Sequence, residues 1–212
     1  MTFDVKRLNT VLIPTATVTL LSSVSIVQAA TIKFQASLNG TQVVPATLST
    51  ATGKATLELN EDATQLSYFI SLEGLNLVEE PLERTNPEDV TAIHFHIGLL
   101  GNNGPHVLNI FGMPSEDDSD LVVDFTNNTL AGIWDDGDVI ASQPFAPGDT
   151  KPLTAFVDDL VAGKLYIQVH PTDDDRTIRG QISSIPEPSI SFGLFSFIAL
   201  NFVSKISKKR IK

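Results

Sequence analysis

The stretch IKFQASLNG at residues 32–40 decides the fold of this chain. Apolar and polar side chains alternate along it, and it ends at Asn39 and Gly40, two residues that favour turns. Such alternation is typical of a β-strand with one face buried and the other in water. A second alternating run, GKATLEL, follows at residues 53–59. Both runs favour an antiparallel β-domain.

Similar short runs continue to residue 182, separated by Gly, Asn and Pro. No long helical period appears between residues 31 and 185. Further strands are predicted at residues 66–72, 90–97, 107–111, 129–134, 164–170 and 177–182. One short helical turn is expected at residues 158–163, ended by Gly163. Residues 79–89 and 115–120 are predicted to be exposed acidic loops. The pattern predicts an antiparallel sandwich or barrel.

The first 30 residues have the pattern of a signal peptide. A weakly basic start precedes an uncharged, mainly apolar run at residues 11–27, and the small residues Ala29 and Ala30 follow. We expect signal peptidase to cut after Ala29 or Ala30, so that the mature chain begins near Thr31. An uncleaved anchor helix or a buried core helix is the alternative.

A second targeting pattern occupies residues 186–212. Pro186, Glu187 and Pro188 precede an uncharged run at residues 189–203, and a cluster of Lys and Arg ends the chain. This order resembles the PEP-CTERM sorting signal of exopolysaccharide-producing bacteria. The resemblance implies a transient apolar membrane helix and cleavage near the proline motif by an exosortase, a membrane protease. An ordinary tail anchor is the alternative, although the apolar run has 15 residues and a comfortable span needs about 20.

The domain between these ends is strongly acidic. The ends hold seven of the 14 basic residues but only two of the 25 acidic ones, so residues 31–185 carry seven basic and 23 acidic side chains, a net charge near −16. Such a charge disfavours nucleic acid and anionic lipid and favours cations or a basic partner. The chain has no cysteine, which excludes thiol catalysis and thiolate metal sites.

Histidines supply the candidate metal ligands. His94 and His96 are two apart on a predicted strand, so both side chains lie on one face, roughly 6.5 Å apart. Two such imidazoles can share an ion, with His170 on a later strand as a third ligand and His106 as a weaker candidate. Alternatively, these histidines hydrogen-bond loops within the fold, and Arg179 ties down the same corner.

Acidic turns are a second candidate cation site. Residues 135–138 and 173–175 place several carboxylates close together, and hard oxygen ligands suit calcium. Their spacing matches no EF-hand, and a solvated acidic loop is the alternative.

Five motifs, in order, resemble the CHRD domain, which was named from repeats in chordin. They are FQASLNG (34–40) with Val44 and Pro45 after it, ATGKA (51–55), AIHFHIG (92–98) running on to GNNGP (101–105), LVAGKLYIQVH (160–170) and IRGQI (178–182). The resemblance covers residues 33–182. It implies an extracellular, immunoglobulin-like or superoxide-dismutase-like β-sandwich or barrel without an established activity. Its motif residues here are Gly98, Gly104, Pro105, Gly163, Arg179 and Gly180.

Two details bear on metal binding. The family often has an aliphatic residue where this chain has His106, which makes an additional ligand possible. A similar His-x-His strand carries copper in Cu,Zn superoxide dismutases, a parallel at the level of the fold. This chain lacks the disulfide of those enzymes, and its sequence contains no complete second metal site.

We therefore expect a signal peptide at residues 1–30, a CHRD domain at 31–185 and a sorting signal at 186–212. The predicted protein is an exported, noncatalytic binding module of the cell surface or extracellular matrix, with a protein or polysaccharide as its partner. One alternative is a histidine-ligated metalloprotein, a copper or zinc carrier or a weak oxidoreductase. Another is a membrane-anchored envelope protein that undergoes no sorting.

Overall fold

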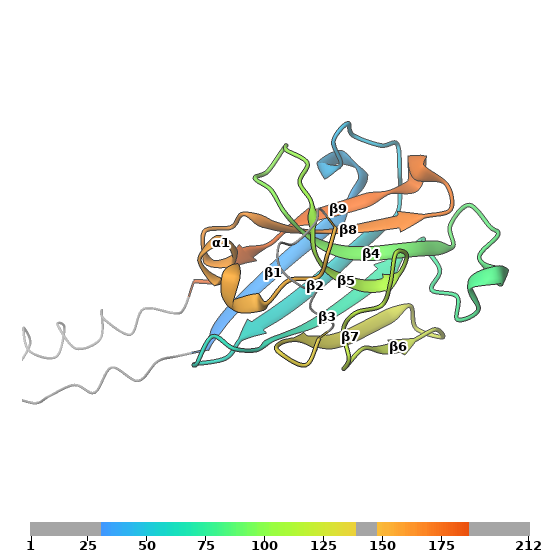
Figure 1. The fold of residues 1–212 in the computed structure, drawn as a ribbon. Helices are drawn as coiled ribbons and strands as arrows, with labels where there is room; N and C mark the ends of the chain where they lie inside the picture. The colour runs from blue at the N-terminus through green and yellow to red at the C-terminus, as the bar shows by residue number, and fades with distance from the viewer. Residues whose placement is uncertain (1–30, 139–147, 187–212) are drawn as a thin grey trace, which may run out of the picture.

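The computed structural model describes residues 31–138 and 148–186 (Figure 1). The predicted signal peptide lies outside these residues, and so does the predicted sorting tail apart from Pro186. No helix in the described ranges is long and apolar enough to cross a membrane.

The described residues form a single antiparallel sheet, ordered β5-β4-β8-β9-β1-β2-β3-β7-β6 with β10 beside β1. Its strands are β1 (Ile32–Asn39), β2 (Thr52–Leu59), β3 (Leu66–Glu73), β4 (Val90–Ile97), β5 (His106–Gly112), β6 (Val122–Asp124), β7 (Thr129–Trp134), β8 (Leu165–Pro171), β9 (Ile178–Gln181) and β10 (Ser183–Ser184). The helical elements are α1 (Val157–Val161) and the single turns η1 (Gly40–Gln42), η2 (Pro81–Glu83), η3 (Leu153–Ala155) and η4 (Asp174–Arg176).

The sheet curls into a half-barrel. Its two wings, β5-β4-β8-β9 and β1-β2-β3-β7-β6, enclose the core. Phe95 on β4 contacts Tyr68 on β3 and Trp134 on β7, with ring centroids 5.4 and 6.0 Å apart, although these strands are distant in the sheet order. The antiparallel all-β prediction is therefore confirmed. One continuous curled sheet takes the place of two separate sandwich sheets, because β9 pairs with β1 and joins the wings.

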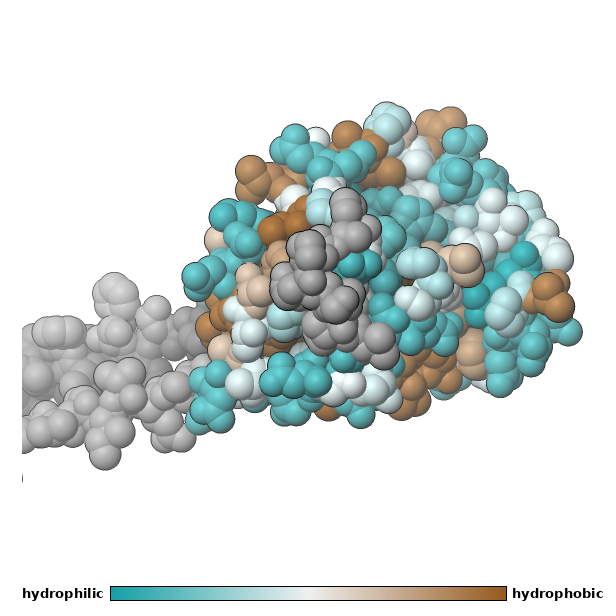
Figure 2. Space-filling model, viewed as in Figure 1, coloured by the Kyte–Doolittle hydropathy of each residue, from teal (hydrophilic) through white to brown (hydrophobic). Residues whose placement is uncertain are grey.

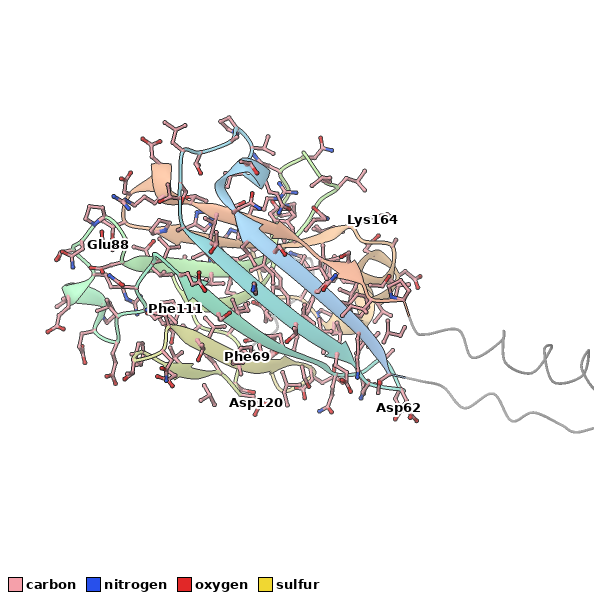
Figure 3. The ribbon with its side chains drawn as sticks, turned by 180° about the vertical axis from the view of Figure 1, so that it is seen from behind. Asp62, Phe69, Glu88, Phe111, Asp120 and Lys164 are labelled. Carbon is pink, nitrogen blue, oxygen red and sulfur yellow. The ribbon has the colours of Figure 1, made fainter. Side chains whose placement is uncertain are left out.

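The outer face of β1, β2 and β3 is largely polar, as alternation requires. Phe69 on β3 is an exception, because it is about half exposed on the face turned to the viewer in Figure 3. In Figure 2, apolar residues on the visible face lie in small areas among polar ones. Large exposed apolar side chains include Leu48, Leu82 and Met113.

The prediction of exposed acidic loops is wrong at three residues. Asp89, Asp117 and Asp118 are buried, although most of residues 79–89 and 115–120 is not. Each buried carboxylate accepts hydrogen bonds from backbone or side-chain donors. Buried charge is tolerated only with such partners. The alternation of apolar and polar residues does not predict these hydrogen bonds.

Candidate metal centre

Strand pairing brings all four histidines of the chain to one region. His94 and His96 lie on β4, which has β5 on one side and β8 on the other. His106 of β5 is directly opposite His96. On β8, His170 is opposite Ala92 and therefore diagonal to His94, which faces Gln168.

The alternation of β4 separates this histidine face from the core. Ile93 and Phe95 are core residues, so His94 and His96 project from the opposite face. Both imidazoles are nevertheless buried, with exposed fractions of 4% and 5%. The prediction that they share one face is confirmed.

Three histidines present nitrogens to one another. One ring nitrogen each from His94, His96 and His106 lies within 4.8 Å of the other two. The ring of His106 is stacked on His94 with centroids 3.8 Å apart and meets His96 edge to face at 4.5 Å. A tetrahedral zinc ion with bonds of about 2.1 Å needs its ligand nitrogens roughly 3.4 Å apart. The three nitrogens lie within 4.8 Å of one another, so any pair wider than the zinc spacing would have to move closer to hold one ion.

His170 lies beside this group. Its ring centroid is 5.5 Å from that of His94 and 6.4 Å from that of His96. The amide of Gln168 donates a hydrogen bond of 3.2 Å to His170 Nε2. The structure thus places the weaker sequence candidate, His106, in the three-nitrogen group and sets His170 next to it.

Hydrogen bonds fix the tautomers of the two buried imidazoles. His94 Nε2–H donates to the Met113 carbonyl at 2.6 Å, and His96 Nδ1–H donates to the Gly104 carbonyl at 2.9 Å. His94 Nδ1 and His96 Nε2 are then lone-pair nitrogens, both buried and both without a hydrogen-bond partner among the described residues. Burial lowers the pKa of each imidazole to about 3, so both are neutral.

The outer pair of histidines is less deeply buried. His106 Nδ1 lies 3.1 Å from the side-chain oxygen of Asn109. Burial also lowers the pKa of His106 and of His170. All four rings are therefore biased towards the neutral form, which is the form that binds metals.

The fold ties the 98–105 loop to this group through Arg179. The fully buried guanidinium donates to the carbonyls of Leu99 and Asn102. Its carbon lies 3.4 Å from the ring centroid of Tyr166, which stacks on His96. Arg179 therefore holds the carbonyls of Leu99 and Asn102 beside Tyr166.

The other predicted motif residues also have structural roles. A side chain at Gly104 would overlap the carbonyl oxygen of Ile97, so this position, which supplies the acceptor for His96, must be glycine. Gly163 has φ +69° just after α1, which confirms the predicted end of the helical turn. Backbone atoms of other residues pack closely against Gly98 and Gly180, and the Pro105 carbonyl accepts a backbone hydrogen bond.

Sequence reasoning missed Asn109, Met113 and Tyr166 as neighbours of the histidines. Tyr166 could have been found, because it is four residues before His170 on one strand and so shares its face. Met113 contributes only a backbone carbonyl, which no residue type encodes.

The acidic turns use their carboxylates locally. Asp138 accepts hydrogen bonds from the N–H groups of Ser119 and Asp135, and Asp173 accepts one from Asp175 N–H. Within residues 31–138 and 148–186, no carboxylates form a three-ligand group comparable to the histidines.

The comparisons with known proteins agree with the motifs. No curated protein and no solved structure matches this chain. A family model for the CHRD domain matches residues 34–182, which is more than half of the chain and nearly all of the described fold. The chain therefore belongs to the CHRD domain family.

Proposed function

We propose that this CHRD domain is an extracellular-type binding module that holds a transition-metal ion, copper or zinc, through His94, His96 and His106. The observation that carries the proposal is the pair of buried, unpartnered lone-pair nitrogens, His94 Nδ1 and His96 Nε2. A buried acceptor without a partner costs about 1–3 kcal/mol, so two on neighbouring imidazoles, with ring centroids 5.6 Å apart, are unusual in a relaxed fold. A bound ion would satisfy both.

The surroundings of the imidazoles support a metal. Metal-binding histidines almost always donate their second ring N–H to a carbonyl or carboxylate, which fixes the tautomer. His94 and His96 both donate to backbone carbonyls in this way. A site built from imidazoles suits copper or zinc better than calcium or magnesium, which prefer oxygen ligands.

We propose that the module holds the ion as a carrier or as part of its own structure. A purely structural role for the histidines is the competing explanation, and it predicts a folded protein that retains no metal. In that case a protein or polysaccharide ligand would be the function to seek.

Metal content of the purified chain tests the proposal. The full chain would be dialysed separately against copper, zinc and calcium, desalted and measured by elemental mass spectrometry. We expect about one equivalent of copper or zinc, lost in His94→Gln and in His96→Gln. The control Gln42→Ala changes a side chain that bonds Ser37 O and Gln181 N–H. A folded wild type that retains no copper or zinc would refute the proposal.

We infer from the chain ends that the module is exported and exosortase-processed, and acts at the cell surface or in the extracellular matrix. The support is the sequence pattern of residues 1–30 and 186–212. Intact mass of the protein from the producing cell tests this. We expect a chain that begins near Thr31 and is cut near Pro186, with the tail retained in Pro186→Ala. An unchanged mass in that variant would favour a simple membrane anchor.

A further inference from the structure

We propose that Asn109 and Asp117 are positioning residues that hold His106 in the tautomer and orientation needed to bind the ion. This inference rests on the proposed metal function and adds a chain of outer residues to it. Asn109 and Asp117 are almost completely buried, and neither was predicted from the sequence to act at the site.

A β-bulge brings Asn109 to the histidine face. Residues three apart on a regular strand point to opposite faces, so His106 and Asn109 would normally be separated. In the pairing of β4 with β5, however, His96 faces His106, Phe95 faces Leu108 and His94 faces Asn109. One extra residue, Val107, is accommodated between the first two pairs. His106 and Asn109 therefore share the face of His96 and His94.

The contacts of Asn109 determine which way its amide points. Its Nδ2 donates to Asp117 Oδ2 at 2.9 Å and to the Gly148 carbonyl at 3.2 Å. Both partners are acceptors, so this end of the amide must be the NH₂ group. The other end, Oδ1, can only accept, and it lies 3.1 Å from His106 Nδ1. His106 Nδ1 must then carry the proton, which leaves Nε2 as the lone-pair nitrogen.

Asp117 holds the amide in this orientation. Its Oδ2 accepts the Asn109 bond and a second bond of 2.6 Å from the Thr150 hydroxyl. Thr150 Oγ1 in turn accepts the backbone N–H of Asn109 at 3.1 Å. These three residues form a closed, buried hydrogen-bond ring attached to β5. Hydrogen bonds thus connect the Asp117 carboxylate to the Asn109 amide, and the Asn109 amide to the imidazole of His106.

In all three proposed ligands, one ring N–H then donates to an oxygen and the other ring nitrogen keeps its lone pair for the ion. His94 and His96 are oriented by backbone carbonyls, and His106 is oriented by a side-chain amide that a carboxylate anchors. Outer partners of this kind typically contribute about 10- to 100-fold to metal affinity. We expect the same from Asn109, with the negative charge of Asp117 adding to the attraction for a cation.

The test is a double-mutant cycle on metal affinity in the full chain. Zinc and copper affinities would be measured by competition with a chelator for wild type, Asn109→Ala, His106→Gln and the double variant. We expect Asn109→Ala to weaken binding about 10- to 100-fold. In the His106→Gln background the same change should have little further effect, because Asn109 acts through His106. Asp117→Asn, which keeps the shape but removes the charge, should fall between wild type and Asn109→Ala.

A matched control and a spectroscopic measurement separate positioning from stability. Asn76→Ala removes another asparagine–aspartate contact, Asn76 to Asp89, that involves none of the histidines. It should leave affinity and the copper(II) paramagnetic resonance spectrum unchanged, whereas Asn109→Ala should shift the spectrum. Wild-type affinity and spectrum in Asn109→Ala, or additive effects in the cycle, would overturn this inference alone. Absence of metal binding in the wild type would overturn the proposed function as well.

Discussion

The rings of His96 and Tyr166 lie face to face, with centroids 4.7 Å apart and an angle of 11° between their planes. Tyr166 belongs to β8, which lies between β4 and β9, and β9 carries Arg179. The phenol ring therefore lies between the imidazole and the guanidinium, which is 3.4 Å from its centroid. The Tyr166 hydroxyl also accepts the N–H of Gly104, whose carbonyl orients His96.

Removing this hydroxyl should destabilise the 98–105 loop. Tyr166→Phe keeps the stacked ring but leaves the part-buried Gly104 N–H without its acceptor. We expect the free energy of unfolding to fall by about 1 kcal/mol, which urea denaturation can measure. Tyr166→Leu should lower it further, because the stacking on His96 is lost too. Wild-type stability in Tyr166→Phe would show that the hydroxyl contact contributes nothing.

Gly104 should tolerate substitution less well than its neighbour Gly101. An added methyl group at Gly104 would overlap the Ile97 carbonyl oxygen, so the backbone must move. Gly101 has φ +79° but open space around it, and Gly101→Ala should cost only about 1–2 kcal/mol of conformational strain. We expect a larger loss of stability in Gly104→Ala, together with weaker metal binding through His96. Equal losses in the two variants would contradict this account of the loop.

Much of the fold was predictable because burial on one face imposes a period of two. The eight predicted strands coincide with observed strands to within one residue at each end. The missed strands, β6 and β10, have three and two residues, too few for alternation to be recognised. The joining of β9 to β1, which makes one continuous sheet, was not predictable, because it depends on the pairing of Asn39 with Arg179.

The site was predictable where it depends on alternation and not where it depends on irregular backbone. His94 and His96 share a face because they are two apart, and that much follows from the sequence. The position of His106 relative to them depends on the register shift at Val107, and no local sequence pattern predicts that shift. The buried role of Asp117 was hidden for another reason, since an aspartate in an acidic segment ordinarily lies in water.

The buried carboxyl of Asp138 should make stability depend on pH. Burial raises its pKa to about 6, above the ordinary aspartate value of 3.8. Between these values the folded state holds a proton that the unfolded chain has lost. Its contribution to stability is therefore present at low pH and declines as pH rises through this window. The difference in unfolding free energy between wild type and Asp138→Asn should fall over that window and then level off.

Urea denaturation from pH 4 to pH 8 would measure this difference. Asp136→Asn is the matched control, because Asp136 belongs to the same turn but is exposed. The difference in unfolding free energy between wild type and Asp136→Asn should not show the fall with pH that we expect for Asp138→Asn. A flat difference for Asp138→Asn would mean that the buried carboxyl titrates as it does in the unfolded chain.

His106 and His170 should differ in their effect on metal binding. His106 presents a nitrogen within 4.8 Å of those of His94 and His96, whereas His170 lies outside this group and bonds with Gln168. We expect His106→Gln to weaken zinc or copper binding more than tenfold and His170→Gln to have a smaller effect. Chelator competition gives both affinities, with apo-protein unfolding as the check that each variant folds.

Thermal unfolding supplies a second measurement of the same difference. An ion that binds only the folded state adds about 2.7 kcal/mol of stability at a concentration 100 times its dissociation constant. At one fixed zinc concentration, the stabilisation of His106→Gln should therefore be well below that of His170→Gln. The reverse order would place His170 among the ligands and His106 outside them. Equal, undiminished stabilisation in both variants would mean that two histidines alone, His94 and His96, hold the ion.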